Sequence, residues 1–424
     1  MSEQIEAIII GAGHAGLSTS YYLTRAGIPH LVLDGGRVGE RWRSSRWDSF
    51  TLVTPNWMCC LPGYPYAGDD PDGFMSREEV VAYLQGYVES FAAPVREGVR
   101  VTAVEMRPGG GDYTVVTDGE VYETPVVVVA TGFFEHPKIP AEAATLAPGI
   151  FQIHSSEYKN PEALDPGAVL VVGSGQSGCQ IAKELHECGR QVYLSTGSAG
   201  RAPRHYRGKD ATWWMVQLGR FEQTVDKLPS PRAKFAANPH LSGSRGGHTI
   251  NLHRFARDGI VLLGHLRSVA RHHVMLAPDL KENLAKADKL AADFKRGVDE
   301  YIEKHGIDAP LPDPANTDEY DGDDGYRQKE ILELDLQAAG IRTIVWAAGF
   351  NIDYSFVRIP VFDEDGYPIQ WRGVTASPGL YFMGVHYQHK NKSDLLYGVG
   401  EDAAYVASVV TARQPAVAFV QIDR

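Results

Sequence analysis

The sequence predicts an α/β fold built from two Rossmann-like dinucleotide-binding domains, the second inserted into the first. Two G-x-G-x-x-G motifs carry this prediction, at residues 11–16 and 173–178, and each follows an apolar run and opens a helix-like stretch. A third observation is a strand followed by Ala-x-Gly, at residues 126–132 and again at 341–349. We expect the chain to leave the first domain at the former and to return to it at the latter.

The first motif predicts a cofactor site made by Gly11, Gly13, Gly16 and Asp34. Glycines allow a tight turn and a close approach of the backbone to a pyrophosphate, which lies at the N-terminus of the following helix. The next predicted strand, residues 30–33, delivers Asp34 at the spacing where a carboxylate meets a ribose hydroxyl. Trp42 falls in a loop-rich segment whose aromatic residues we expect in the core or facing the cofactor.

The second motif, Gly173, Gly175 and Gly178, predicts a second dinucleotide site. Its second strand ends in Ser195-Thr196 rather than an acid, and four cations follow: Arg201, Arg204, Arg207 and Lys209. A missing carboxylate with cations nearby suits the 2′-phosphate of NADPH. A solvated basic loop is the alternative interpretation of these cations.

Composition favours a protein that acts on small molecules. Hydrophobic residues make up 43% of the 424 residues, and 41 basic against 53 acidic residues give a net charge of −12. That charge disfavours nucleic acid and anionic membranes as partners. With no apolar stretch of about 18 residues and no signal-like N-terminal segment, we expect a cytoplasmic protein.

The cysteines predict no dithiol or metal chemistry. Cys59, Cys60, Cys179 and Cys188 form no C-x-x-C pair and suit no zinc site. Buried, inert thiols are favoured over a redox role for the adjacent Cys59 and Cys60. His272-His273 lacks a pattern of acidic ligands nearby, so no metal is expected.

The order of the elements predicts three segments: residues 1–149 form the first dinucleotide-binding domain, residues 150–340 form the second, NADPH-binding domain, and residues 341–424 return to the first. The pattern predicts a helix over 77–91, a hairpin at Asp118-Gly119 and a buried strand over 126–129. Residues 200–330 are expected to be an insertion that shapes a substrate chamber. It contains an amphipathic helix over 280–301, for which packing on its own domain is favoured over a homodimer seam, and an exposed loop or lid over 309–326.

These residues resemble the class B flavoprotein monooxygenases, which include flavin-containing monooxygenases, the plant YUCCA enzymes and, more distantly, Baeyer-Villiger monooxygenases. The resemblance covers nearly the whole chain, residues 200–330 least. Besides the glycine motifs it rests on four stretches: Arg46–Phe50, Ala130-Thr131-Gly132, His154–Lys159 and Gly398–Ala403. Thr131, Gly132, Gly400 and Asp402 are thereby implied to contact the cofactor.

The resemblance implies that NADPH reduces FAD, that reduced flavin and O₂ form a peroxyflavin, and that this species oxygenates a small organic substrate. Tyr158, where Baeyer-Villiger enzymes usually carry Trp, favours oxygenation at nitrogen or sulfur. The active-site Asn of flavin-containing monooxygenases would fall near Val53 or Thr54, so no catalytic Asn is carried over.

Several alternatives stay open. The chain could instead be a flavin reductase that passes electrons to a protein or quinone, or a non-catalytic flavin-bound sensor. His154 and Tyr158 are the candidate catalytic residues, and for His154 a hinge or interdomain hydrogen bond is favoured over direct catalysis. The stretch 386–392 contacts flavin or substrate, or else forms an exposed interdomain loop.

Overall fold

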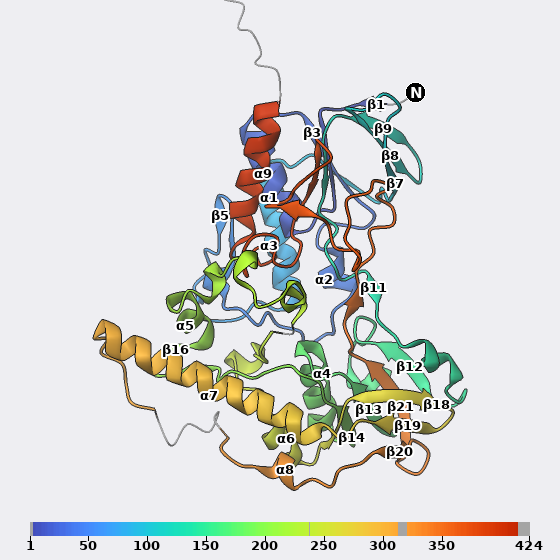
Figure 1. Ribbon diagram of the computed structural model, residues 1–424, viewed down its shortest axis with the longest axis vertical. Coiled ribbons are helices and arrows are strands. Elements are labelled where there is room, and N and C mark those ends of the chain that lie inside the picture. Colours follow the sequence, from blue (N-terminus) through green and yellow to red (C-terminus); the bar gives the residue numbers. More distant parts are fainter. Residues whose placement is uncertain (1–2, 237, 313–319, 414–424) are drawn as a thin grey trace, which may run out of the picture.

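The computed structural model describes residues 3–236, 238–312 and 320–413, which form two lobes (Figure 1). Each lobe is built on its own mainly parallel sheet, as the two glycine motifs predict. The chain passes from the first lobe to the second and back, so the predicted α/β fold with one domain inserted into the other is confirmed.

The sheet of the first lobe has the order β23-β24-β25-β10-β2-β3-β6, and β25 to β6 all run parallel. Its strands are β23 (Gln370–Trp371), β24 (Val374–Thr375), β25 (Leu380–Phe382), β10 (Val127–Val129), β2 (Ala7–Ile10), β3 (His30–Asp34) and β6 (Val95–Glu97). All four residues of β2 are buried, which explains its continuous apolar run.

Helices and a second small sheet cover the two faces of this first sheet. The helices are α1 (His14–Arg25), α3 (Arg77–Ser90) and α9 (Val399–Arg413). On the other face lies a sheet of β1 (Glu3–Gln4), β9 (Val121–Thr124), β8 (Tyr113–Thr117) and β7 (Val101–Met106). Ile9 packs toward the helices, whereas Ile8 and Ile10 pack toward the small sheet, as the alternation of side chains along a strand requires.

The sheet of the second lobe is parallel throughout, with the order β12-β21-β13-β14-β17. Its strands are β12 (Phe151–His154), β21 (Ile341–Trp346), β13 (Ala168–Val172), β14 (Val192–Ser195) and β17 (Val261–Leu263). One face is covered by α4 (Gln176–Glu187) and α6 (Leu252–Asp258). The other face is covered by β18 (Leu266–Ala270), β19 (His273–Leu276) and β20 (Glu333–Asp335).

The return to the first lobe comes later than the boundary at residue 341. Strand β21 pairs with both β12 and β13, so residues 341–346 still belong to the second sheet. The crossing follows at β22 (Phe350–Asn351), which pairs antiparallel with β11 (His136–Pro137) of the outgoing crossing. The two crossings therefore run side by side. The sequence places the return at residue 341 because an apolar run does not show to which of the two sheets its strand belongs.

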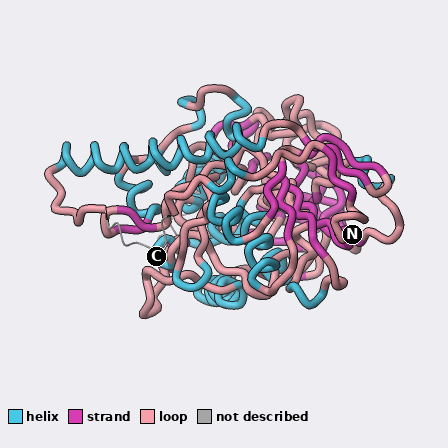
Figure 2. Tube along the Cα trace, turned by 90° about the horizontal axis from the view of Figure 1, so that it is seen from below, coloured by secondary structure: helices cyan, strands magenta, loops and turns pink. Residues whose placement is uncertain are grey.

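The segment 200–330 is not one separate insertion, because β17, α6, β18 and β19 belong to the second lobe's own layers. The remainder contains β15 (His205–Tyr206), β16 (Lys209–Asp210), α5 (Ala211–Gln217), α7 (Leu280–His305) and α8 (Asp324–Arg327). Figures 1 and 2 show α7 extending along one side of the molecule. Of the expected loop over 309–326, residues 313–319 lie outside the described residues.

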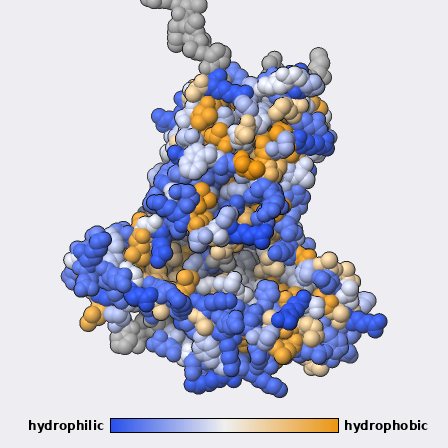
Figure 3. Space-filling model, in the orientation of Figure 1, coloured by the Kyte–Doolittle hydropathy of each residue, from blue (hydrophilic) through white to orange (hydrophobic). Residues whose placement is uncertain are grey.

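Helix α7 buries its apolar face within its own chain, as expected. Leu280, Leu284, Ala287, Phe294 and Val298 are all buried. Leu280 and Leu284 pack in the largest hydrophobic cluster, and Phe294 and Val298 pack with residues of α5. Over the face shown in Figure 3, hydrophilic residues predominate and apolar ones form small separate patches. No helix in the described ranges combines the length and the low polarity that a bilayer crossing requires.

The remaining short elements connect these layers. They are α2 (Glu40–Ser44), β4 (Cys60–Leu61), β5 (Tyr64–Pro65) and the 3-10 turns Asn56–Met58, Ala141–Thr145, Pro161–Ala163, Arg220–Glu222, Val225–Lys227, Pro231–Phe235 and Ser244–Gly246.

Candidate active site

The first glycine turn joins β2 to α1 and has two different kinds of glycine. Gly11 has φ +108°, and a Cβ there would lie 2.5 Å from the Ala130 carbonyl oxygen; a Cβ on Gly16 would lie 1.9 Å from the Gly11 carbonyl oxygen. Around a Cβ on Gly13, no other described atom lies within 4 Å. Gly11 and Gly16 therefore allow close packing of the backbone, whereas Gly13 leaves open space at the N-terminus of α1.

The second turn, between β13 and α4, repeats this geometry. Gly173 has φ +106° and its Cβ would lie 2.5 Å from the Ala347 carbonyl oxygen; a Cβ on Gly178 would lie 1.8 Å from the Gly173 carbonyl oxygen. A Cβ on Gly175, like one on Gly13, would meet no described atom within 4 Å. The chain thus builds the same cradle twice, and each has an open face at a helix N-terminus that suits a pyrophosphate.

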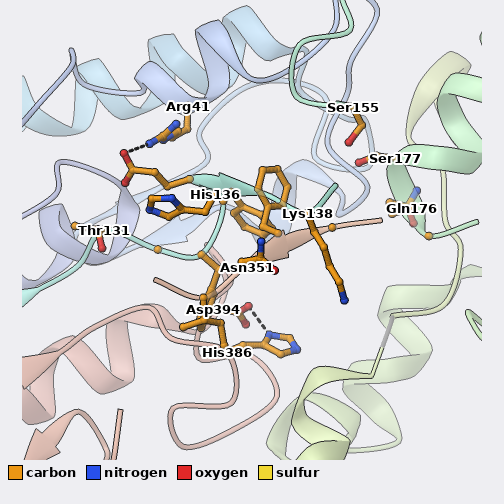
Figure 4. A pocket seen from close by; sticks show the side chains of 18 of the residues that line it. Arg41, Thr131, His136, Lys138, Ser155, Gln176, Ser177, Asn351, His386 and Asp394 are labelled. Carbon is orange, nitrogen blue, oxygen red and sulfur yellow. Dashed lines mark hydrogen bonds and ion pairs between the residues drawn. The ribbon is translucent and has the colours of Figure 1, made fainter. Parts of the chain in front are cut away.

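Both cradles open into one cavity of about 2080 Å³. Figure 4 shows side chains from both lobes around it, among them Thr131 and His386 on one side and Gln176 and Ser177 on the other. Ten of the predicted site residues line the cavity: Gly11, Gly13, Asp34, Trp42, Thr131, Gly132, Gly173, Gly175, Ser195 and Thr196. Eight do not: Gly16, Gly178, His154, Tyr158, Arg201, Arg204, Gly400 and Asp402.

Asp34 lies at the carboxyl end of β3, beside the first cradle. Its two carboxylate oxygens accept hydrogen bonds of 2.7 Å from the backbone N–H groups of Ala12 and Gly36. These bonds fix the carboxylate at the cavity wall and leave each oxygen a further lone pair. That is the arrangement a ribose hydroxyl requires.

The end of β14 differs from the sequence-based expectation. Both hydroxyls there are buried and donate to backbone carbonyls, that of Ser195 to Gly264 at 2.9 Å and that of Thr196 to Leu263 at 2.7 Å. The cavity wall beside them is formed by Gly197, Ser198 and His265.

The two predicted phosphate-binding arginines have partners of their own. Arg201 forms an ion pair with Asp288 at 2.9 Å. Arg204 is fully buried, pairs with Asp210 at 2.6 Å and donates to the Val53 carbonyl at 2.7 Å. This placement does not support a phosphate contact by either residue. Arg204 instead joins the second lobe to the loop of the first lobe that carries Val53.

His154 and Tyr158 are buried beside the cavity rather than in its wall. The His154 ring is hydrogen-bonded on both nitrogens, to the Ser156 hydroxyl at 2.9 Å and to the Gly349 carbonyl at 3.0 Å, and burial lowers its pKa. It thereby joins β12 to the returning crossing. The Tyr158 hydroxyl donates to Glu184 of α4 at 2.7 Å. This placement favours the hinge interpretation of His154 and gives Tyr158 no access to a reacting atom.

The residues that line the cavity near α9 precede in the chain those that the resemblance implies. Residues 394–397 line it, whereas Gly400 is partly buried beside Pro62, and a Cβ there would lie 3.0 Å from the Pro62 Cγ. Asp402 is 2% exposed, lies 3.6 Å from Arg372, and burial raises its pKa. Gly400 and Asp402 therefore support the cavity wall from behind.

The site residues predicted from the sequence do not include Arg46, a charged side chain that lines the cavity. Arg46 lies over the rings of Trp42, Phe50 and Phe134, at 5.3, 5.6 and 5.6 Å from their centroids. Burial, with a smaller effect from the charge of Arg41, lowers the pKa of Arg46 to about 10, so Arg46 stays cationic at neutral pH. Its place in the Arg46–Phe50 stretch was the available signal, but nothing local showed where the side chain points.

No thiol chemistry is placed at this site. None of the four cysteines, all of which are described, lines the cavity, and all four are free. Burial, with a smaller effect from Cys60, raises the pKa of Cys59 to about 12, which leaves it as an inert thiol. Within the described residues, no cluster of three or more His, Cys, Asp or Glu side chains is placed to hold a metal ion.

Comparison with known proteins agrees with this geometry. Residues 8–216 match the family model of pyridine nucleotide-disulphide oxidoreductases. The chain is 32% identical over 409 residues to the "uncharacterized oxidoreductase CzcO-like" of Geobacillus kaustophilus, which covers 96% of this chain and 98% of that protein. It is 31% identical over 236 residues to the probable indole-3-pyruvate monooxygenase YUCCA10 of Arabidopsis thaliana, which covers 54% of this chain and 60% of that protein.

Solved structures share the whole fold, and each alignment covers 97% of this chain. A flavin-containing monooxygenase from Stenotrophomonas maltophilia aligns with a TM-score of 0.63, 20% identity and 99% of its own chain. The bacillithiol disulfide reductase of Staphylococcus aureus aligns with a TM-score of 0.60 and 17% identity over 100% of its own chain. OTEMO in complex with FAD and NADP aligns with a TM-score of 0.56 and 17% identity over 86% of its own chain.

The two cradles at one interlobe cavity give this chain the fold of flavin-dependent oxidoreductases with two dinucleotide-binding domains, and its partial matches are consistent with the resemblance to class B flavoprotein monooxygenases. The chain belongs to the family of the CzcO oxidoreductases.

Proposed function

We propose that this protein is an FAD- and NADPH-dependent monooxygenase that transfers one oxygen atom from O₂ to a small organic substrate. The observation that carries the proposal is the pair of equivalent cradles facing one cavity, because hydride transfer between two dinucleotides requires that both be held in one space. The first cradle and Asp34 suit FAD, and the second suits the nicotinamide nucleotide.

The residues present fit two dinucleotides. Gly13 and Gly175 leave the space that a pyrophosphate needs, and one buried oxygen of Asp394 in the cavity wall has no hydrogen-bond partner among the described residues. When bound, flavin supplies the redox and oxygen chemistry. The chain's own residues hold the two nucleotides, and the aromatic side chains around Arg46 give the cavity an apolar lining beside the space between them.

NADPH is proposed as the hydride donor over NADH because no acid ends β14, where an NAD site usually has its ribose-binding carboxylate. Ser198 and His265 line the cavity beside that end and are the side chains available to the 2′-phosphate. One charge-assisted contact corresponds to a preference of about tenfold or more. Flavin reduction by each nucleotide in a stopped-flow experiment tests this, and equal rates and affinities would contradict it.

A disulfide reductase role is not favoured, although one structural neighbour has that activity, because no cysteine lines the cavity. Electron transfer to a quinone or protein, and a non-catalytic sensor, differ from the proposal in what happens to O₂ and NADPH. A sensor does not turn over NADPH, and a reductase delivers its electrons to an acceptor.

The test incubates the FAD-loaded enzyme with NADPH, labelled O₂ and a thioether, a tertiary amine or a cyclic ketone in turn. We expect a product that carries one labelled oxygen atom, and a fall in hydrogen peroxide release when the right substrate is added. The preference for nitrogen or sulfur over a carbonyl carbon rests only on the family resemblance at position 158, because Tyr158 itself does not line the cavity, and the ketone arm tests this preference. Rapid quinone reduction without any labelled product would establish the reductase instead.

A further inference from the structure

The order of the first sheet defines where the flavin half of FAD has to lie. The first cradle follows β2, and Asp34 ends β3 on one side of it. On the other side lie β10 and then β25, all parallel to β2. A dinucleotide spans the carboxyl ends of such strands with its pyrophosphate at the central turn. With the adenosine half over β3, the flavin half passes over the ends of β10 and β25.

The end of β25 places an ionisable pair along this path. A Cβ on Gly384 would lie 2.6 Å from the Cβ of Ala15, so the turn after β25 lies against the first turn of α1. His386 follows that turn, and its Nδ1 lies 2.7 Å from a carboxylate oxygen of Asp394. Both side chains line the cavity, and Figure 4 shows them together at its wall.

The surroundings of this pair fix its orientation. The backbone carbonyl of Asp394 lies 3.0 Å from the Nε2 of His14, and the Tyr367 hydroxyl donates to the His386 carbonyl at 2.7 Å. Among the described residues, the hydrogen bond of the His386 ring is the one made by its Nδ1, so its Nε2 is available to a bound group. The carboxylate therefore holds the imidazole so that one nitrogen is committed and the other is free.

The charge state follows from the same contacts. Burial opposes a charge on His386, but the hydrogen bond and the negative charge of Asp394 outweigh it, so the pKa of His386 is raised. The neighbouring His14 is different, because burial lowers its pKa despite its contact with Asp394. Of the two histidines that contact Asp394, it is therefore His386 whose cationic form, with Nε2–H as a donor, is stabilised.

We propose that His386, oriented by Asp394, contacts the flavin half of the bound FAD and stabilises the negative charge that the flavin ring acquires on reduction. The inference rests on the proposed function, since it requires FAD at the first cradle. A cation in a partly buried site beside the flavin ring raises its midpoint potential and so favours hydride transfer from the nucleotide. Asp394 acts through His386 and is a positioning residue.

The test measures the midpoint potential of the purified FAD-loaded protein by equilibration with a reference dye. His386→Gln keeps a polar side chain but cannot become cationic, and Asp394→Asn removes the carboxylate that holds the imidazole. We expect the equilibrium for two-electron reduction to fall at least tenfold in each variant, which is a decrease of about 30 mV. His389→Gln is the matched control, because His389 lies three residues further along and does not line the cavity.

A second readout separates charge from shape. The reduced flavin of the wild type should stay anionic to lower pH than that of His386→Gln, as followed by its absorbance under anaerobic conditions. His386→Lys, which restores a cation, should recover part of the potential.

If the equilibrium constant for two-electron reduction of the flavin stays within twofold of the wild-type value in both variants, the inference is overturned and the proposed function is left intact. Loss of FAD from both variants with an unchanged circular dichroism spectrum would also overturn it, because the pair would then serve binding rather than redox tuning. Wild-type protein that binds no FAD would instead overturn the proposed function.

Discussion

At the scale of single residues, the glycines of the two cradles fall into two groups, according to which atoms a Cβ methyl group at each position would contact. Gly11, Gly16, Gly173 and Gly178 face backbone carbonyl atoms at 2.5 Å or less, so they serve the fold. Gly13 and Gly175 have extended backbones with φ near −75° that any residue adopts, and they face open space. Their role belongs to the ligand rather than to the chain.

A first prediction uses this difference. Gly13→Ala should fold normally but lose most of its FAD, because the methyl group enters the space of the pyrophosphate. Gly175→Ala, the matched variant, should keep FAD and raise the KM for NADPH. Flavin absorbance per protein after desalting measures the first, and steady-state kinetics measure the second. Full flavin occupancy in Gly13→Ala would count against the first cradle as the FAD site.

A second prediction concerns the arginines. Arg204→Ala removes a buried cation, takes the ion-pair partner from Asp210 and takes the side-chain donor from the Val53 carbonyl, so we expect a loss of about 3–5 kcal/mol of folding free energy. Arg201→Ala should leave the ratio of kcat/KM for NADPH and NADH unchanged, since Arg201 pairs with Asp288 away from the cavity. Thermal unfolding and kinetics check the two statements. A tenfold fall of that ratio in Arg201→Ala would return Arg201 to the phosphate site.

At the scale of elements, four charges join the second lobe to the start of α9. Lys390 lies 2.6 Å from Glu222 and 2.8 Å from Glu401, and Lys392 contacts the same two carboxylates. Two backbone hydrogen bonds reinforce this junction, from Val225 to the His389 carbonyl at 2.9 Å and from Asn391 to the Gln223 carbonyl at 3.0 Å. The stretch 386–392 is therefore divided: His386 faces the cavity, and the two lysines form the junction.

The third prediction tests this junction. Glu222→Gln leaves Lys392, which is 8% exposed, with a single carboxylate, and should cost about 1 kcal/mol or less because Glu222 itself is half exposed. Proteolytic cleavage in residues 220–235 should become faster, and more so at low salt, where the wild-type ion pairs are strongest. Glu364→Gln, at an exposed carboxylate, is the control. Equal cleavage rates in both variants would mean that the backbone bonds alone hold the junction.

At the scale of the whole molecule, buried histidines make stability depend on pH. Burial lowers the pKa of His14, His30, His154 and His240. Each binds a proton more readily in the unfolded chain, so folding stability is complete above about pH 6.5 and is lost as the pH falls through the lowered pKa of the folded state. His386, whose pKa is raised, acts in the opposite direction, but it is outnumbered.

The fourth prediction follows from this imbalance. The Tm of the protein should be several degrees lower at pH 5.5 than at pH 7.5. His30 lies in the first lobe, hydrogen-bonded to Ser20 at 2.8 Å, and His30→Gln should reduce this difference. His305→Gln, at an exposed position on α7, should leave the difference unchanged. A Tm independent of pH across this range would contradict the prediction.

Much of the fold could be read from local sequence. Both strand-turn-helix units, the hairpin at Asp118-Gly119 and helix α7 lie where periodicity and glycine placed them, because those signals depend only on neighbours along the chain. The sheet to which β21 belongs could not be read this way. Strand pairing joins residues 341–346 to 151–154 and 168–172, and an apolar run carries no record of its partner.

The sequence by itself determined that two dinucleotide cradles exist and which glycines form them, because a phosphate turn is a local structure with strict steric demands. Only the tertiary structure decided which side chains face the shared cavity. Arg204 and Tyr158 turn inward to Asp210 and Glu184, whereas Arg46 and His386 line the cavity wall. The physical reason is that burying a charged side chain costs free energy unless a partner of opposite charge or a hydrogen-bonding group compensates it. Such a partner is often distant in the sequence, and only folding brings it near.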